Sequence, residues 1–75
     1  MPELPDGWTW SSRKDVEGGR LYLAERMYPH DIAQKRNVID EYTTILVGPD
    51  GPVVGPIRFE RAAAQHDYDA RQAIG

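Results

Sequence analysis

The chain has 75 residues, a formal net charge of −3 and no cysteine. This length allows one domain, residues 1–75, and is too short for two independent hydrophobic cores. The absence of cysteine excludes disulfide bonds, a thiolate nucleophile and a cysteine-type zinc site. The mild acidic balance argues against sequence-independent binding of nucleic acid, which needs a dense cationic surface. No apolar run reaches the roughly eighteen residues of a membrane span, and the start of the chain lacks the features of a signal peptide. We therefore expect a soluble, cytoplasmic protein.

Residues 1–7 are rich in proline and acid and predict an extended lead-in. A first strand is expected from Trp8, because Trp8-Thr9-Trp10 places both indoles on one face at period two. The chain has a single phenylalanine. A domain this small therefore needs the apolar surface of tryptophan, and we expect at least one of the two indoles in the core.

Gly18-Gly19 lies between two extended runs and predicts a two-residue hairpin turn, because both glycines accept a positive φ. In that register Val16 faces Leu21. The second strand should cover residues 21–27. We expect it to end at Pro29, since proline cannot donate a hydrogen bond to a central ladder.

The segment 30–40 allows two interpretations. Ile32, Arg36 and Ile39 would form one stripe of a short helix capped by Asp31. A loop followed by a strand that starts near Val38 fits the same residues. We expect a loop or a single helical turn, and the strand remains the alternative.

The second hairpin has the clearest turn chemistry. Strand-forming residues 42–47 lead into a turn in which Pro49 has its φ preset and Asp50 suits the next position. Gly51 accepts the left-handed conformation that follows. The pattern predicts a type I turn with a glycine bulge and a short return strand through Val53-Val54.

Residues 57–74 are rich in alanine and arginine and predict a helix. The face expected to be buried consists of Phe59, Ala62, Ala63, His66, Ala70, Ala73 and Ile74. Tyr68 then lies on the outer face, near Arg61 and Gln72. The expected fold is an α+β domain: two hairpins across residues 8–56 form an antiparallel sheet of three or four strands, and the helix covers one face.

No catalytic or metal-binding constellation emerges from the sequence. His66, Asp67 and Asp69 are close in sequence, but neighbouring helix residues point about 100° apart, so they do not converge. His30-Asp31 has no nucleophile at a motif distance. We therefore expect no enzymatic activity, no cofactor and no metal.

Two sets of residues are candidate contacts for a protein partner. Tyr68, with Arg61 and Gln72 nearby, presents an aromatic side chain flanked by arginine, as interface patches often do. Arg13 and Arg26 would share an edge of the first hairpin and could bind an acidic partner. The uncovered sheet face and the strand edges are also expected binding surfaces, with a second copy of the chain as an alternative occupant.

Part of the chain is similar to the methyl-CpG-binding domain. The similarity lies in Leu4-Pro5-Asp6-Gly7-Trp8 and in Ile45–Gly51, which leads through Arg58-Phe59 to a helix. The family's Gly/Lys-rich loop that enters DNA is missing, and Val54-Gly55 stands where its reading arginine is expected. The resemblance implies a small sheet-type DNA-binding domain, which is the alternative function.

The chain as a whole resembles accessory proteins of phages and prophages. It is very short, free of cysteine and mildly acidic, with hairpins and one terminal helix. Anti-CRISPR proteins are one such group, and they mostly act as stoichiometric binders of host complexes. The resemblance implies a non-enzymatic module that binds and inhibits a host protein complex, and this is the leading hypothesis.

Overall fold

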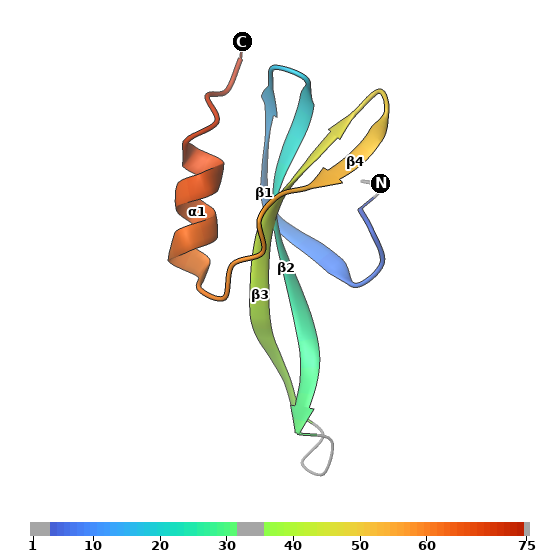
Figure 1. Cartoon of the computed structure of the whole chain (residues 1–75), viewed down its shortest axis with the longest axis vertical. Coiled ribbons are helices and arrows are strands. Elements are labelled where there is room, and N and C mark those ends of the chain that lie inside the picture. The colour runs from blue at the N-terminus through green and yellow to red at the C-terminus, as the bar shows by residue number, and fades with distance from the viewer. Residues whose placement is uncertain (1–3, 32–35, 75) are drawn as a thin grey trace.

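Four antiparallel strands form one sheet in the order β1-β2-β3-β4, and a single helix packs on it (Figure 1). The computed structural model describes residues 4–31 and 36–74. The elements are β1 (Trp8–Val16), β2 (Gly19–Asp31), β3 (Arg36–Gly48), β4 (Gly51–Val54) and α1 (Arg61–Asp69). The predicted α+β class, the antiparallel sheet and the helix on one face are confirmed. Within the described ranges, no helix has the length and apolar character needed to cross a membrane.

The β2–β3 hairpin is the longest part of the sheet and extends beyond its neighbours (Figure 1). β1 pairs with β2 only as far as Arg26, whereas β3 follows β2 to Asp31. Pro29 lies in this extension, opposite Asn37. The prediction that Pro29 ends the second strand is wrong. Because β1 does not reach that far, one side of β2 lacks a ladder there, and proline is tolerated on such an edge.

Residues 36–40 belong to β3. The loop or helical turn expected over residues 30–40 is therefore wrong for this part, and the strand alternative describes it better. Pairing with β2 supplies the backbone hydrogen bonds that a short helix would have made internally. Residues 32–35 of this prediction lie outside the described part of the chain.

The first hairpin turns at Glu17-Gly18, one residue earlier than predicted. Val16 pairs with Gly19, and Lys14 is the residue opposite Leu21. Gly18 has a φ of 100° and supports the turn. Gly19 is required for another reason, because a Cβ at this position would lie 2.3 Å from the carbonyl oxygen of Val47 on β3. The predicted register was wrong by one residue on each strand. Gly19 is not part of the turn, because it is needed where the chain closely approaches Val47 on β3.

The second hairpin turns at the predicted residues, and the left-handed conformation expected of Gly51 is confirmed. Gly48 pairs with Gly51 around Pro49-Asp50, and Gly51 has a φ of 98°. The local sequence determines this turn, because its proline and glycine each suit the conformation of their own position.

Apolar side chains are buried on both faces of the sheet. The face under α1 contains Val16, Leu21 and Leu23, packed against Ala64 and Tyr68. The other face contains Trp8, Ala24 and Ile45, with Leu4 and Val47 packed against them. Trp8 is the core tryptophan that the composition predicted. In Figure 1, α1 lies on one side of the sheet, and β4 and the start of β1 bend toward the other.

Helix α1 is shorter than predicted, and its buried face is a different one. Ala64 is 0% exposed and Tyr68 is 7% exposed, whereas Phe59 is 74% exposed and precedes the helix. The reason is the segment before α1, where Arg58 and Tyr42 exchange two backbone hydrogen bonds of 2.7 and 2.8 Å. This pairing keeps the chain extended through Arg58, so a stripe counted from Phe59 has the wrong phase.

The expected helix also ends too late. Ile74 donates its backbone N–H to the carbonyl oxygen of Asp15 at 2.9 Å, and Ala73 bridges to Val16 on β1. Residues after Asp69 therefore follow the sheet instead of continuing the helix. The alanines proposed for the buried stripe at positions 62, 70 and 73 are exposed.

The helix phase predicts unequal effects of the same substitution at two alanines. Ala64→Asp places a carboxylate in the buried helix–sheet contact and should lower the free energy of unfolding by about 3 kcal/mol or more, because the charge has no partner there. Ala62→Asp on the exposed face should change it by less than about 0.5 kcal/mol. Urea denaturation measures both, and equal midpoints would mean that the helix is rotated.

Alanine substitution should destabilise the protein by different amounts at Gly19 and Gly51. Gly19→Ala brings its Cβ against the Val47 carbonyl, whereas a Cβ at Gly51 meets nothing within 4 Å. Gly51→Ala should cost about 1 kcal/mol for the left-handed backbone alone. We expect Gly19→Ala to cost clearly more in thermal denaturation. A smaller loss at Gly19 than at Gly51 would refute the close approach of β2 to β3.

Candidate protein-binding surfaces

Most arginines in the described part of the chain are bound to carboxylates. The ion pairs are Arg20–Asp15 at 2.9 Å, Arg26–Glu41, Arg58–Asp67 at 2.7 Å and Arg61–Glu25 at 2.9 Å. Exposed pairs of this kind add only about 0–1 kcal/mol each. Their main consequence is electrostatic, because they neutralise cationic groups that could otherwise face a polyanion.

The Arg58–Asp67 pair also fixes geometry. Nε and Nη2 of Arg58 donate to the two carboxylate oxygens of Asp67 at 2.7 and 3.2 Å. The pair joins the segment before α1 to the helix itself. These hydrogen bonds hold the pKa of the Asp67 carboxyl below its ordinary value.

Tyr68, the central residue of the predicted helical patch, is part of the core. Its ring lies under Lys14, with Nζ 4.3 Å from the ring centroid, and the same Nζ donates to the Tyr68 carbonyl oxygen at 2.8 Å. Burial raises the pKa of the Tyr68 hydroxyl. Its predicted place on an outer face is therefore wrong, because the helix turns this side chain toward β1 and β2.

The other two residues of that patch do not meet. Arg61, in the first turn of α1, is bound to Glu25 and lies over the ring of Tyr42 at 5.6 Å. Gln72 lies beyond the other end of the helix and is exposed. The predicted patch is therefore not formed as one surface.

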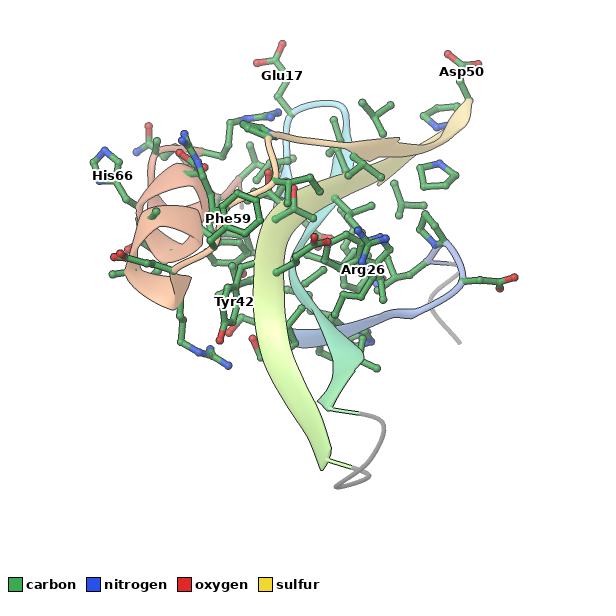
Figure 2. All side chains as sticks on the ribbon, turned by 60° about the horizontal axis from the view of Figure 1, so that its bottom comes forward. Glu17, Arg26, Tyr42, Asp50, Phe59 and His66 are labelled. Carbon is green, nitrogen blue, oxygen red and sulfur yellow. The ribbon has the colours of Figure 1, made fainter. Side chains whose placement is uncertain are left out.

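Arg26 and Arg13 do not share an edge either. Arg26 lies on β2, an inner strand, where its guanidinium carbon is 4.4 Å from the ring centroid of Trp8. Figure 2 shows Arg26 surrounded by other side chains. Arg13 lies on β1, opposite Tyr22, and is exposed. Of the five candidate contacts, Arg13 and Gln72 are exposed and form no ion pair with any described residue, and whether they bind a partner stays a prediction.

A second surface was not anticipated by the sequence. Four exposed apolar side chains lie on β4 and on the segment between β4 and α1, and we call them the apolar edge: Val53, Val54, Ile57 and Phe59. Phe59 is 74% exposed and Val53 is 62% exposed. Figure 2 shows Phe59 on this segment, in front of β3. The sequence analysis missed the apolar edge because Phe59 fits the periodicity of the predicted helix, whereas the observed helix starts two residues later, at Arg61.

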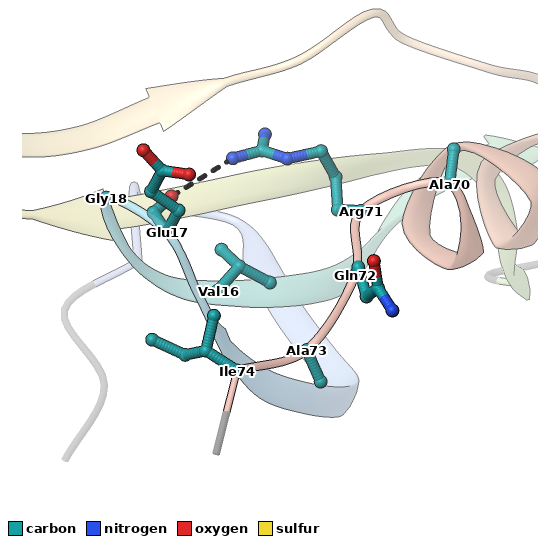
Figure 3. A pocket seen from close by; sticks show the side chains of 8 residues that line it. All are labelled: Val16, Glu17, Gly18, Ala70, Arg71, Gln72, Ala73 and Ile74. Carbon is teal, nitrogen blue, oxygen red and sulfur yellow. Dashed lines mark hydrogen bonds between the residues drawn. The ribbon is translucent and has the colours of Figure 1, made fainter.

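A shallow groove of about 600 Å³ lies between the tip of the first hairpin and the residues after α1 (Figure 3). Its lining residues are Val16, Glu17 and Gly18 on one side and Ala70 to Ile74 on the other. Arg71 spans it and donates to the Glu17 carbonyl oxygen at 3.3 Å. None of the lining residues is a serine, cysteine or histidine, so the groove offers no nucleophile and no histidine base.

The titratable residues of α1 are dispersed. Asp69 accepts a hydrogen bond from Gln65 at 3.0 Å, Asp67 is bound by Arg58, and His66 is exposed (Figure 2). Among the side chains that the structure describes, in residues 4–26 and 41–74, no group of three or more metal-ligating residues could hold an ion.

No protein-family model, no curated protein and no solved structure matches the chain. The resemblances to the methyl-CpG-binding domain and to phage accessory proteins therefore stay predictions. The surfaces described above are the basis for a functional proposal.

The burial of Tyr68 predicts a loss of stability at alkaline pH. Its pKa is raised in the folded state, so the folded chain holds the phenolic proton more tightly than the unfolded chain. This contribution is complete below the ordinary tyrosine pKa of 10.0 and is lost as the pH rises through the folded pKa. Tyr68→Phe should remove that loss, measured as the urea midpoint against pH.

The matched control is Tyr42→Phe, which removes a hydroxyl from a half-buried ring and leaves Tyr68 in place. It should retain the alkaline loss of stability. If Tyr68→Phe behaves like the unmodified chain above about pH 10, Tyr68 is not a buried residue.

Proposed function

We propose that this chain is a non-enzymatic protein-binding module whose contact surface is the apolar edge. One observation carries the proposal: the single phenylalanine of the chain lies outside the core, 74% exposed, on a segment with three more exposed apolar side chains. Single exposed apolar residues are common, whereas exposed apolar side chains that lie together are typical of an interaction site. Ile57 and Phe59 are two residues apart on extended backbone and point the same way, and Val53 and Val54, consecutive on β4, extend the apolar surface on its two faces.

The energetics support this interpretation. Full burial of a phenylalanine stabilises a protein by about 1.5–3 kcal/mol. Because Phe59 is mostly exposed, this fold lacks most of that stabilisation. A small domain has few apolar side chains with which to build a core. A partner that covers Phe59 would recover the free energy that folding leaves unused.

The apolar edge is also held in position before any partner arrives. Ile57 and Phe59 flank Arg58, whose backbone is bonded to Tyr42 and whose side chain is bonded to Asp67. Because these bonds already order the backbone, binding would cost less conformational entropy than the ordering of a free loop.

Binding through this edge should use side chains rather than the addition of another strand. The Gly55 N–H donates to the Thr44 carbonyl at 2.8 Å, so the alternation of an antiparallel ladder directs the backbone groups of Val54 and Pro52 outward. Proline has no N–H, which removes one of the donors that an added strand would need.

DNA binding, the alternative function, has less support. Within the described residues four arginines are already bound to carboxylates, and a duplex binder needs several free cations for phosphate contacts. Fluorescence anisotropy with duplex DNA at low and moderate salt tests it directly. Binding that weakens steeply with salt would favour DNA over the apolar edge.

The finer proposal is that the partner is a host protein complex which the module inhibits stoichiometrically. Its support is the resemblance to phage and prophage accessory proteins. A second copy of the chain is the alternative occupant of the apolar edge. Sedimentation equilibrium of the purified chain distinguishes the two, since only self-association raises the mass with concentration.

Phe59→Ser tests the apolar edge. Because Phe59 is mostly exposed, the free energy of unfolding should change by less than about 0.5 kcal/mol. Binding of a partner retained by the unmodified chain on an affinity column should weaken by about tenfold or more, as for central aromatic residues of interfaces. Ala62→Ser, an exposed position on the neighbouring helix, is the control and should retain the partner.

Two results of this experiment would contradict the proposal. A partner that both variants retain equally well binds elsewhere on the chain, and the apolar edge is then not the contact surface. A Phe59→Ser variant that unfolds would show that Phe59 contributes to the core.

A further inference from the structure

We infer that Trp10 and Arg13 form a second binding site, which takes a carboxylate side chain of an acidic protein segment. The site lies on β1, at the opposite end of the strand order from β4. It does not depend on the apolar edge or on the function proposed for it.

A β-bulge creates the site. Trp10 pairs with Ala24 and Ser12 pairs with Leu23, so Ser11 is an extra residue on β1. In a regular strand, residues three apart point to opposite faces of the sheet. The extra residue reverses this alternation, and Trp10 and Arg13 therefore project from the same face. Bulges often re-aim a side chain in this way beside functional sites.

The two side chains stack. The guanidinium carbon of Arg13 lies 5.2 Å from the ring centroid of Trp10, within the range of a cation–π contact. Trp10 in turn contacts Tyr22 edge to face, with ring centroids 5.5 Å apart and planes inclined by 64°. Tyr22 is buried, so the indole rests on a fixed support, while Trp10 itself remains 38% exposed.

Arg13 has no carboxylate within ion-pair distance among the residues described. Asp15, two residues along β1, is already bound by Arg20. Arg71, another described arginine outside the ion pairs, donates to a backbone carbonyl, so it differs from Arg13. Arg13 is thus an exposed, stacked guanidinium whose hydrogen-bond donors have no acid to bind.

An exposed guanidinium beside an indole is suited to bind a carboxylate. The Arg13 guanidinium has no carboxylate partner among the described residues, and the edge of a guanidinium matches a carboxylate with two parallel hydrogen bonds of about 2.7–2.9 Å. The exposed part of the indole can cover an apolar side chain beside that carboxylate. A nucleic acid would need several free cations in a row. The next residue, Lys14, is bound to the Tyr68 carbonyl oxygen, and four of the described arginines are bound to carboxylates. The overall charge of −3 opposes an acidic partner only at long range, and salt screens it beyond roughly 8–10 Å.

The test is an NMR titration of the full chain with a glutamate-rich peptide, observed at the indole N–H resonance of Trp10. The resonance should shift on addition of the peptide, and a lysine-rich peptide of equal length should leave it in place. Arg13→Gln should weaken binding tenfold or more. Arg71→Gln should change it less than about twofold, since Arg71 donates to the Glu17 carbonyl oxygen and its removal leaves no carboxylate unpaired. Arg13→Lys, which keeps the charge but loses the planar fork, should bind at an intermediate level.

Several results would overturn the inference. These are an unchanged Trp10 resonance, an equal loss in the Arg13 and Arg71 variants, or binding of oligothymidylate in place of the glutamate-rich peptide. Phe59→Ser should bind the peptide normally. A loss in that variant would show that the peptide occupies the apolar edge and not the Trp10–Arg13 site.

Discussion

The structure depends on the backbone pairing of Tyr42 with Arg58. These two residues exchange both of their hydrogen bonds, and the chain after β4 is thereby held along β3 until just before the helix. Because the helix then starts at Arg61, it turns Ala64 and Tyr68 toward the sheet. The same constraint leaves Phe59 in solvent, since an extended residue next to the paired Arg58 cannot reach the core beneath α1. One nonlocal contact thus determines the buried face of the helix and the position of the apolar edge.

This dependence explains which features the sequence could predict. The turn at Pro49-Asp50 was predictable because each of its residues suits one conformation independently of the rest of the chain. The class of the fold followed from strand and turn signals of the same local kind. The helix phase was not predictable, because periodicity alone does not reveal that Arg58 pairs with Tyr42. The register of the first hairpin failed similarly, since the role of Gly19 is set by its approach to Val47 on another strand.

The candidate contact residues also depend on nonlocal contacts, which the sequence does not reveal. Tyr68 was placed outside because its exposure was derived from the wrong helix phase. Arg26 was expected on an edge with Arg13, and Arg61 was expected beside Tyr68. The sequence cannot show that Glu41 and Glu25 bind these two arginines. Arg13 is exposed and lies over an aromatic ring, and it has no carboxylate partner among the described residues. The bulge at Ser11 is what brings Trp10 to it. A pattern of strict alternation assigns the two to opposite faces, so this pair becomes visible only in three dimensions.

The two surfaces have a common physical basis. Each is a group of side chains that the fold holds in position but leaves exposed. The Tyr42–Arg58 backbone pairing and the Arg58–Asp67 bond hold the apolar edge. Tyr22 supports Trp10 and with it the Trp10–Arg13 pair. In a chain of this size, core and contact residues compete for few apolar side chains. The core uses residues of β2, β3 and α1 together with Trp8 and Val16 at the two ends of β1, whereas the contacts lie in the middle of β1, on β4 and on the segment that follows β4. Substitution of the exposed residues should therefore separate binding from folding, which makes both surfaces open to direct mutational measurement.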